Sequence, residues 1–294
     1  MKLIRANFSV IEQGSGIDGI YKIIEQAGRT CYKSEDKITE DSAKEFVDRM
    51  IKSGHGAMLE HGTVYLAIPI SEWRCTDDYR DSYISNPYSN VNDSLVDWEN
   101  NEGTVYITTN LRVLVENGWL DDLQYICEPT EYHEKRITVK FTTDQGILRE
   151  FTRHRVFSFA VESTRYCNYS KNRFSNEITF IQPNWISDKD IENYHMDFGY
   201  FTDQDTNHIT AVNRFMSALK NAEYFYMELI KLGWKPQQAR NILPLATKCD
   251  MVMTGFVSDW LHFFALRDAA SAHPQAQELA HSLHETFIQR GLIK

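Results

Sequence analysis

Two stretches of alternating apolar residues flank a long acidic segment, and this arrangement most restricts how the chain can fold. Thr63–Ile70 and Ile137–Thr143 repeat apolar residues with the two-residue period of a half-buried strand. The whole chain has a net charge of −10. Residues 71–136, between the two stretches, hold fourteen acidic and five basic residues, and the rest of the chain is almost neutral. The segment also carries aromatic and aliphatic residues, which predicts a folded insertion at about 71–136 and not a flexible linker.

The remaining periodicity predicts mostly helices. A short strand is expected over residues 2–10. Helices are expected over 17–28, with Gly28 as the cap, from Asp41 or Ser42 to Lys52, over 144–155 and over 206–232, with further helices starting near Pro236, Ser258 and Pro274. Strands and helices therefore alternate along a chain of 294 residues, which could form one elaborated domain or two.

Composition indicates a cytoplasmic protein that does not contact membranes. No apolar run reaches the roughly 18–20 residues that span a bilayer, and the first residues lack the apolar stretch of a secretory signal. The five cysteines (Cys31, Cys75, Cys127, Cys167 and Cys249) are widely spaced and form no C-x-x-C pair. We therefore expect reduced thiols, with neither a disulfide framework nor a cysteine-rich metal site.

Two motifs suggest ligand sites that their surroundings do not support. Gly14-Ser15-Gly16-Ile17-Asp18-Gly19 is a literal G-x-G-x-x-G, but the second strand of a dinucleotide-binding unit is missing downstream, which indicates an ordinary turn. The run from His55 to His61 has neither zincin spacing, so no metal site is predicted. It could instead be a polar loop that presents His and Glu to a ligand, or a structural cap.

A basic stretch at 149–173 predicts a compact anion site. It holds six basic residues and two acidic ones in an acidic protein. On a helix, Arg153 and Arg155 would lie about 200° apart and could serve two anions, whereas Arg149 and Arg153 would share a face. Guanidinium groups beside apolar residues need partners, and phosphates or the electron-rich edge of a flavin would provide them. A solvated helix face remains an alternative; nucleic-acid binding would call for a broader basic surface.

The same stretch resembles a known family. Arg153-His154-Arg155, seven residues and then Ser163 match the signature of the flavin-dependent thymidylate synthases without a gap. Three flanking elements resemble the family in the same order: His55 with Glu60-His61, the Q-x-A-R-x-x-L-P-like run Gln238–Pro244, and Phe263–Arg267. The resemblance covers most of the chain outside 71–136.

This resemblance implies a fold and a reaction. The fold would be α/β of the α+β kind, a single domain over residues 1–294 with a central, mainly antiparallel sheet flanked by helices. The reaction would convert dUMP to dTMP, with carbon from methylenetetrahydrofolate and hydride from FAD reduced by NADPH. The family assembles as a homotetramer with active sites shared between subunits, so we expect the same here, with no nucleic-acid partner.

The resemblance also assigns roles to individual residues. It implies FAD contacts from Ala57, Glu60, Arg153, His154, Arg155 and His262. It implies dUMP contacts from Glu150, Arg153, Glu162, Ser163, Arg165, Arg240 and Arg267, with Arg240 approaching from another subunit. Arg267 would be the catalytic residue, because a guanidinium near uracil N3 and O4 stabilises the anionic ring without losing its own proton.

Several positions depart from the family pattern. Ala57 stands where relatives often have a hydroxyl, His262 where Asn is common, and Val161 where a more polar residue is usual, while Phe256-Val257-Ser258 lacks polar groups that relatives can present to FAD. These departures leave open an alternative, a flavin- or nucleotide-binding relative that has lost methyl transfer and serves as an oxidase or binding protein. The insertion is interpreted as structural decoration ahead of a partner-binding element.

Overall fold

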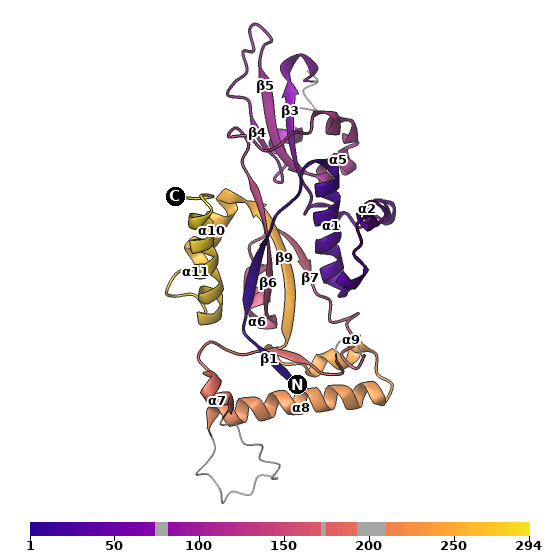
Figure 1. Cartoon of the computed structure of the whole chain (residues 1–294), viewed down its shortest axis with the longest axis vertical. Coiled ribbons are helices and arrows are strands. Elements are labelled where there is room, and N and C mark those ends of the chain that lie inside the picture. Colours follow the sequence, from indigo (N-terminus) through magenta and orange to yellow (C-terminus); the bar gives the residue numbers. More distant parts are fainter. Residues whose placement is uncertain (74–81, 172–174, 193–209) are drawn as a thin grey trace, which may run out of the picture.

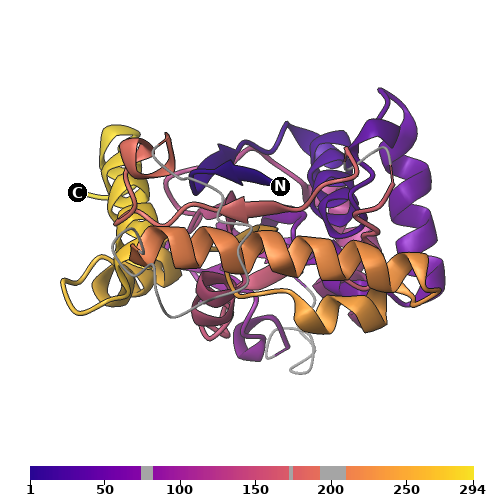
Figure 2. The ribbon, with the colours of Figure 1, turned by 90° about the horizontal axis from the view of Figure 1, so that it is seen from below.

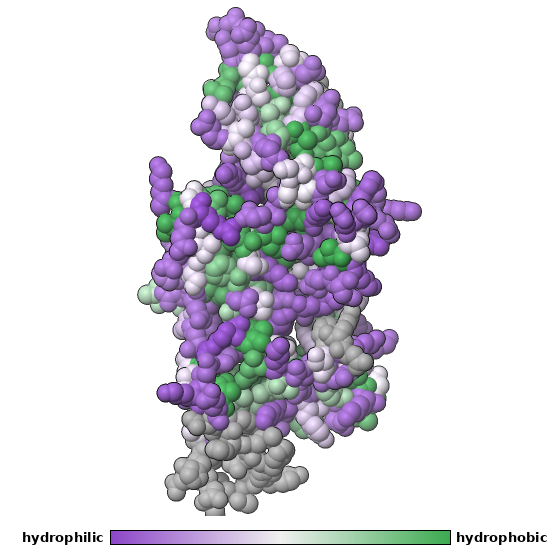
Figure 3. Space-filling model, in the orientation of Figure 1, coloured by the Kyte–Doolittle hydropathy of each residue, from purple (hydrophilic) through white to green (hydrophobic). Residues whose placement is uncertain are grey.

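The computed structural model describes residues 1–73, 82–171, 175–192 and 210–294. The molecule is elongated, with a central sheet in the middle, a second sheet at one end and a long helix across the other end (Figure 1). In the space-filling view of this face, polar side chains break the apolar surface into small patches (Figure 3).

The central sheet has four strands in the order β2-β6-β9-β7, and every neighbouring pair is antiparallel. Its strands are β2 (Asn7–Ile11), β6 (Arg136–Asp144), β7 (Ser158–Val161) and β9 (Lys248–Phe256). The predicted mixed fold with a mainly antiparallel sheet is therefore confirmed. Strand β9, at the centre of the sheet, lies in a stretch for which the sequence pattern predicts no strand.

Helices cover both faces of this sheet (Figure 1). Helix α1 (Gly16–Tyr32) packs on one face through Ala27, against Ala160 and Val252. The other face is covered by α6 (Gln145–Phe151), α10 (Val257–Arg267) and α11 (Pro274–Gln289). Their apolar side chains enclose Phe141, and the buried Trp260 donates a hydrogen bond from Nε1 to the Ile137 carbonyl oxygen at 3.2 Å. This packing fixes the end of α6 against the end of α10, where the candidate site lies.

The described residues of the acidic segment form strands and helices, and their sheet begins earlier than residue 71. Strand β3 (Thr63–Pro69) pairs with β5 (Thr104–Asn110), and β5 pairs with β4 (Asn90–Asn92), in a sheet separate from the central one. The unit continues through η2 (Ile70–Glu72), α5 (Leu111–Asn117) and η3 (Leu120–Tyr125). Because β3 pairs with β5 over its whole length, it belongs to the acidic unit and not to the central sheet. We call residues 63–135 the β3–β5 unit.

The opposite end of the molecule is built from short strands and a long helix. Strand β1 (Lys2–Ile4) pairs in parallel with β8 (Thr179–Ile181), and α8 (Ala211–Lys231) runs across this end of the molecule (Figure 2). Around them lie α7 (Asp188–Glu192), α9 (Pro236–Ala239) and η6 (Arg240–Ile242). The strand predicted over 2–10 is thus two strands in different sheets. Arg5 lies between the two strands, and its Nη2 donates a hydrogen bond to Asp188 Oδ1 at 2.7 Å.

Several predicted helix boundaries change. Helix α1 continues through Gly28 to Tyr32 and ends at Lys33, whose φ is +48°. Gly28 is not a cap: a Cβ there would lie 2.4 Å from the Phe46 ring, so the residue permits close packing of α2 (Ser42–Ser53). A short turn, η1 (Glu35–Lys37), follows α1. Helix α8 starts after Thr210, whose side chain caps the Asn213 amide; the predicted start at Thr206 lies outside the described residues.

Two further sequence predictions concern cysteines and membranes. Cys31, Cys127 and Cys249 are free thiols, Cys167 is buried, and Cys75 lies outside the described residues. Within the ranges that the structure describes, no helix is both long and apolar enough to cross a bilayer.

Candidate active site

The Arg-His-Arg sequence lies in a turn between α6 and β7. Asp144 caps α6 by accepting a hydrogen bond from the Ile147 amide at 2.8 Å, and the helix ends at the buried Phe151. The predicted helix to Arg155 is therefore too long, and the separation of about 200° between Arg153 and Arg155 does not apply. The turn nevertheless leaves both arginines accessible to ligands, because it exposes their side chains and buries His154 between them.

The two exposed arginines suit an anionic ligand. Neither guanidinium of Arg153 or Arg155 has a hydrogen-bond or ion-pair partner among the described residues, and His262 is exposed nearby, its ring centroid 6.2 Å from that of His154. Guanidinium forks bind phosphate oxygens well. This donor set fits the phosphates of a flavin dinucleotide, with Ala57 able to offer only its backbone.

Arg267, the last residue of α10, is held by the end of α6. Its Nη1 donates to Glu150 Oε2 at 2.7 Å, its Nη2 to the Glu150 carbonyl oxygen at 2.8 Å, and its Nε to His154 Nε2 at 3.0 Å. Because a guanidinium only donates hydrogen bonds, His154 accepts through Nε2 and carries its proton on Nδ1. Three bonds to two residues thus fix the plane of the Arg267 fork. The structure brings together three predicted site residues that lie up to 117 positions apart.

The environment keeps His154 neutral. Burial, followed by the charges of Arg267 and His262, lowers the pKa of His154 to about 4. A neutral ring can accept the Arg267 hydrogen bond, whereas a protonated ring would repel the guanidinium. Since the pKa is below that of an unfolded histidine, this contact stabilises the fold fully above about pH 6.5 and is lost as the pH falls toward 4.

We therefore expect the His154 ring to stay in its neutral Nδ1–H form at pH 6, with a titration midpoint near 4. Two-dimensional ¹⁵N NMR of the imidazole nitrogens would show this directly. Arg267→Met should raise the midpoint, because it removes the second-largest cause of the shift, while Arg49→Met on the exposed surface of α2 should not. A fully protonated His154 at pH 6 in the unmodified protein would contradict this account of the site.

A second group of predicted residues lies at the far end of β7. The Ser163 amide donates to the Cys31 carbonyl oxygen at 2.9 Å, and the Ser163 carbonyl oxygen accepts from the amides of Tyr166 and Cys167. These bonds hold a tight loop that leaves Arg165 exposed, with its guanidinium 5.4 Å from the Tyr166 ring centre. Arg240, from η6 of the same chain, donates to Thr164 Oγ1 at 3.1 Å. The predicted approach of Arg240 from another subunit stays a prediction.

Glu162 does not point outward with this loop. It is buried, and its Oε2 accepts hydrogen bonds from Lys248 Nζ at 2.8 Å and from the Asp250 amide at 3.0 Å. Its carboxylate therefore fixes the start of the loop to β9, and the loop presents Ser163 and Arg165. A cavity of about 500 Å³ borders Glu162 and Lys248, which is a size suited to a small ligand.

The anchor of Glu162 is part of a buried network of charges. Asp250 pairs with Lys248 at 2.7 Å and with Lys33, and Lys140 lies 3.7 Å from Asp250. Thr142 Oγ1 also donates to Asp250 at 2.7 Å. Although burial alone would raise the pKa of Asp250, the two lysines Lys248 and Lys33 hold it well below its usual range. Sequence reasoning missed this network; the alternation of Lys248 and Asp250 on one strand face was the available signal.

The third predicted segment surrounds the short helix α3 (Gly56–Leu59). Ala57 is exposed, whereas Glu60 is buried and its carboxylate binds Arg112 of α5. His61 is buried with Nδ1 2.8 Å from Thr254 Oγ1, and His55 is exposed, so the two histidines do not face one ion. Across the described ranges, no cluster of three potential metal ligands occurs. The β3–β5 unit thus contacts a predicted FAD residue directly, through Arg112.

Comparison with known proteins identifies the family. The model of a family described as "Thymidylate synthase complementing protein" matches residues 17–81 and 129–290, about three quarters of the chain. The chain belongs to this family. The unmatched residues between the two segments, 82–128, fall within the β3–β5 unit, whereas strand β3 of that unit lies in the matched part.

Curated relatives carry the name that the motif suggested. A flavin-dependent thymidylate synthase from Halobacterium salinarum is 28% identical over 148 residues, which are 49% of this chain and 59% of that protein. One from Synechocystis sp. is 27% identical over 153 residues, which are 52% of this chain and 66% of that protein. One from Pyrococcus abyssi is 28% identical over 145 residues, 49% of this chain and 51% of that protein. The match thus spans about half to two thirds of the length of these relatives.

A more distant likeness exists among solved structures. One is a UMP/dUMP methylase, PolB from Streptomyces cacaoi, which was solved with 5-Br dUMP and with 5-Br UMP and is 16% identical in sequence. The two structures have TM-scores of 0.42 and 0.43. Each alignment covers 98% of this chain, and they cover 93% and 92% of the PolB chains. Likeness at that level establishes neither a common fold nor a common activity.

Proposed function

We propose that the protein is a flavin-dependent thymidylate synthase, which methylates dUMP to dTMP with methylenetetrahydrofolate as carbon donor and FAD, reduced by NADPH, as hydride source. Family membership supports the proposal, and one observation carries it: Arg267 is fixed by Glu150 and a neutral His154, beside the unpaired guanidiniums of Arg153 and Arg155. That arrangement offers a rigid cation for an electron-rich ring and free cations for phosphates. We also propose a cytoplasmic homotetramer with shared active sites.

Each residue would have a distinct task. Bound FAD would supply the hydride chemistry, and Arg153, Arg155 and the neutral His154 would hold it, with Ala57, Glu60 and His262 around it. Arg267 would donate hydrogen bonds to the uracil edge and stabilise negative charge on the ring, so that C5 becomes nucleophilic. Because its fork is already oriented by Glu150, little reorganisation would be needed when the ring becomes anionic. Ser163 and Arg165 would bind the nucleotide phosphate.

The deciding experiment has two parts. The first is to titrate dUMP into the FAD-loaded protein and follow the visible flavin spectrum; a saturable shift would place nucleotide and flavin in one site. The second is to measure tritium release from 5-labelled dUMP with methylenetetrahydrofolate and NADPH. Failure to bind FAD would contradict the proposal as a whole.

One observation keeps a second candidate open. Phe256 is buried, and its amide is taken by Asp259 Oδ2 at 3.0 Å, so the 256–258 segment offers a flavin little polar contact. The alternative is a flavin- or nucleotide-binding relative without methyl transfer. A flavin spectrum that responds to dUMP, together with no tritium release under any reducing condition, would favour this alternative.

Arg165→Ala is expected to weaken dUMP binding about 10- to 100-fold, because a hydrogen bond to a charged phosphate contributes about 1.5–3 kcal/mol. The dissociation constant from the flavin titration measures the effect. Lys171→Ala, in the same basic stretch, is the matched control and should bind dUMP as the unmodified protein does. Unchanged dUMP affinity in Arg165→Ala would remove Arg165 from the phosphate site.

A further inference from the structure

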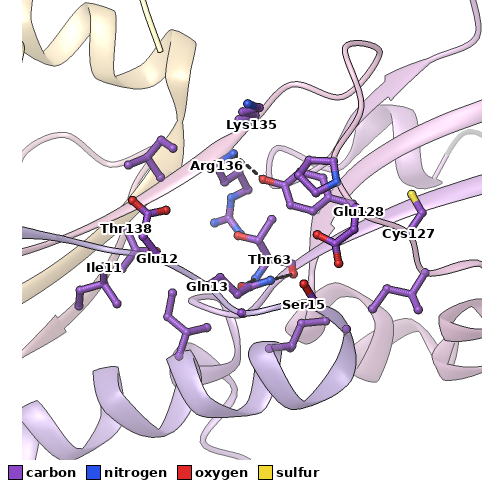
Figure 4. A pocket seen from close by; sticks show the side chains of 18 of the residues that line it. Ile11, Glu12, Gln13, Ser15, Thr63, Cys127, Glu128, Lys135, Arg136 and Thr138 are labelled. Atoms are coloured by element: carbon purple, nitrogen blue, oxygen red, sulfur yellow. Dashed lines mark hydrogen bonds between the residues drawn. The ribbon is translucent and has the colours of Figure 1, made fainter. Parts of the chain in front are cut away.

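A separate cavity of about 210 Å³ lies where β2, β3, β6 and the start of α1 meet. Its lining includes Gln13, Ser15, Thr63, Arg136 and Thr138 (Figure 4). None of these is among the residues assigned to FAD or dUMP above. The cavity is far too small for a dinucleotide, but it is large enough for a phosphate group or a small carboxylic acid.

Arg136 is the unusual residue of this cavity. It is only 6% exposed, yet within the described ranges no carboxylate lies at ion-pair distance from its guanidinium. Nη1 donates to the Glu60 carbonyl oxygen at 3.0 Å and Nη2 to Ser158 Oγ at 3.4 Å, while Nε has no hydrogen-bond partner. A buried charge without a counter-ion is costly, and such charges in proteins are generally paired.

The charge remains at neutral pH. Burial is the largest effect on Arg136 and lowers its pKa to about 10, so the guanidinium is still ionised at pH 7. Figure 4 shows its side chain extending toward Gln13 and Thr63, whereas that of the neighbouring Lys135 points away. Ser15, Thr63 and Thr138 line the same space, although the Thr138 hydroxyl lies 2.8 Å from Thr254 Oγ1. The cavity therefore combines several small polar residues with a cation that has no carboxylate at ion-pair distance among the described residues, although Glu60 and Asp259 act on it from farther away.

The start of α1 adds to the positive potential. The turn Gly14-Ser15-Gly16 lines the cavity, and the side chain of Ser15 makes no capping hydrogen bond to the helix. Amides in the first turn of a helix favour anions. Gly19 keeps the turn tight, since a Cβ there would lie 1.7 Å from the Gly14 carbonyl oxygen.

Two carboxylates also border the cavity, and their positions bear on its selectivity. Glu12 forms an ion pair with Arg290, the residue that follows α11. Glu128 is exposed at the cavity rim and has no ion pair with Arg136. Glu128 is thus the one lining carboxylate free to compete with an incoming anion.

We propose that this cavity is an anion site in which Arg136 binds the phosphate or carboxylate group of a small metabolite, separate from the flavin and nucleotide residues. The ligand's oxygens would pair with the guanidinium and accept hydrogen bonds from the surrounding hydroxyls. Arg136 also donates to the carbonyl oxygen of Glu60, a residue assigned to FAD, so the two sites adjoin; anion binding and dTMP formation are nevertheless measured separately, and either can fail without the other.

The test measures anion binding to the full-length protein saturated with FAD and dUMP, so that the phosphate-binding residues assigned above are already occupied. Inorganic phosphate and succinate are titrated separately at constant ionic strength, with calorimetry and the thermal midpoint as readouts and sodium chloride as the reference. We expect saturable binding of at least one of them and a rise in the midpoint. If phosphate alone binds, the ligand is a phosphate compound; if succinate alone binds, it is a carboxylic acid. Binding of neither would overturn the proposal.

Variants separate a ligand site from a structural arginine. Arg136→Met should reduce anion affinity at least tenfold, and because it removes an unpaired buried charge it should leave the thermal midpoint without anion unchanged or higher. Glu128→Gln should tighten binding, because it removes the competing carboxylate, whereas Lys44→Met on α2 should change nothing. If Arg136→Met does not fold, Glu128→Gln still decides: unchanged anion affinity in that variant would contradict the assigned cavity.

Discussion

Replacing Arg267 by lysine is expected to lower dTMP formation by about 100- to 1000-fold, the usual loss when one oriented charge-stabilising donor is removed from a transition state. A lysine keeps the positive charge but cannot make the three bonds that Arg267 makes to Glu150 and His154. Tritium release from 5-labelled dUMP measures activation of the ring, and dTMP formation measures the whole reaction.

The matched controls test whether the loss is specific. Arg49→Lys, on the exposed face of α2, should retain full activity. Glu150→Gln keeps the shape of the side chain but removes its charge, and should lower activity less than Arg267→Lys, since the Glu150 carbonyl oxygen still holds the guanidinium. If Arg267→Ala formed dTMP at the normal rate, the role assigned to Arg267 would be wrong.

The second large effect concerns stability. Asp250→Asn is expected to lower the free energy of unfolding by about 3–5 kcal/mol, because it removes the closest carboxylate from the largely buried side chains of Lys33 and Lys248 and leaves Glu162 to both, with Glu35 3.8 Å from Lys33. Urea unfolding followed by tryptophan fluorescence provides the measurement. Glu45→Gln breaks an exposed pair with Arg49 and should cause no measurable change.

The pH dependence distinguishes a lost ion pair from a packing defect. The pKa of Asp250 is held far below that of an unfolded aspartate, so its contribution is fully present above about pH 4 and is lost as the pH falls further. The stability difference between the unmodified protein and Asp250→Asn should therefore shrink below pH 4. A difference that stayed constant from pH 7 to pH 3 would indicate altered packing.

The sequence identified the family, but it did not predict how the candidate site residues are arranged. The spacing from Arg153 to Ser163 is local, and it identified the family correctly. The end of α6 was placed four residues too late because residues 152–155 contain no glycine or proline that would mark a helix end, and nothing in the sequence shows that His154 turns inward to meet Arg267. That contact joins residues 113 positions apart, which no local pattern encodes.

Strand pairing was the other limit. The alternation in Thr63–Ile70 correctly predicts a strand, but a strand pattern does not say which partner it pairs with. Strand β3 pairs with β5 and not with the central sheet, which moves the boundary of the acidic unit. Strand β9 is buried on both faces, so its residues show no alternation, and it was missed for that reason.

The β3–β5 unit shares its interior with the rest of the protein. Ile20 and Ile24 of α1 and Phe46 of α2 belong to the same apolar cluster as Leu66 and Ile107 of the two long strands. Without those strands, the apolar side chains of α1 and α2 in this cluster would be exposed to water. A shortened version of this chain that lacks β5 would therefore need polar substitutions on the exposed sides of α1 and α2 to remain folded.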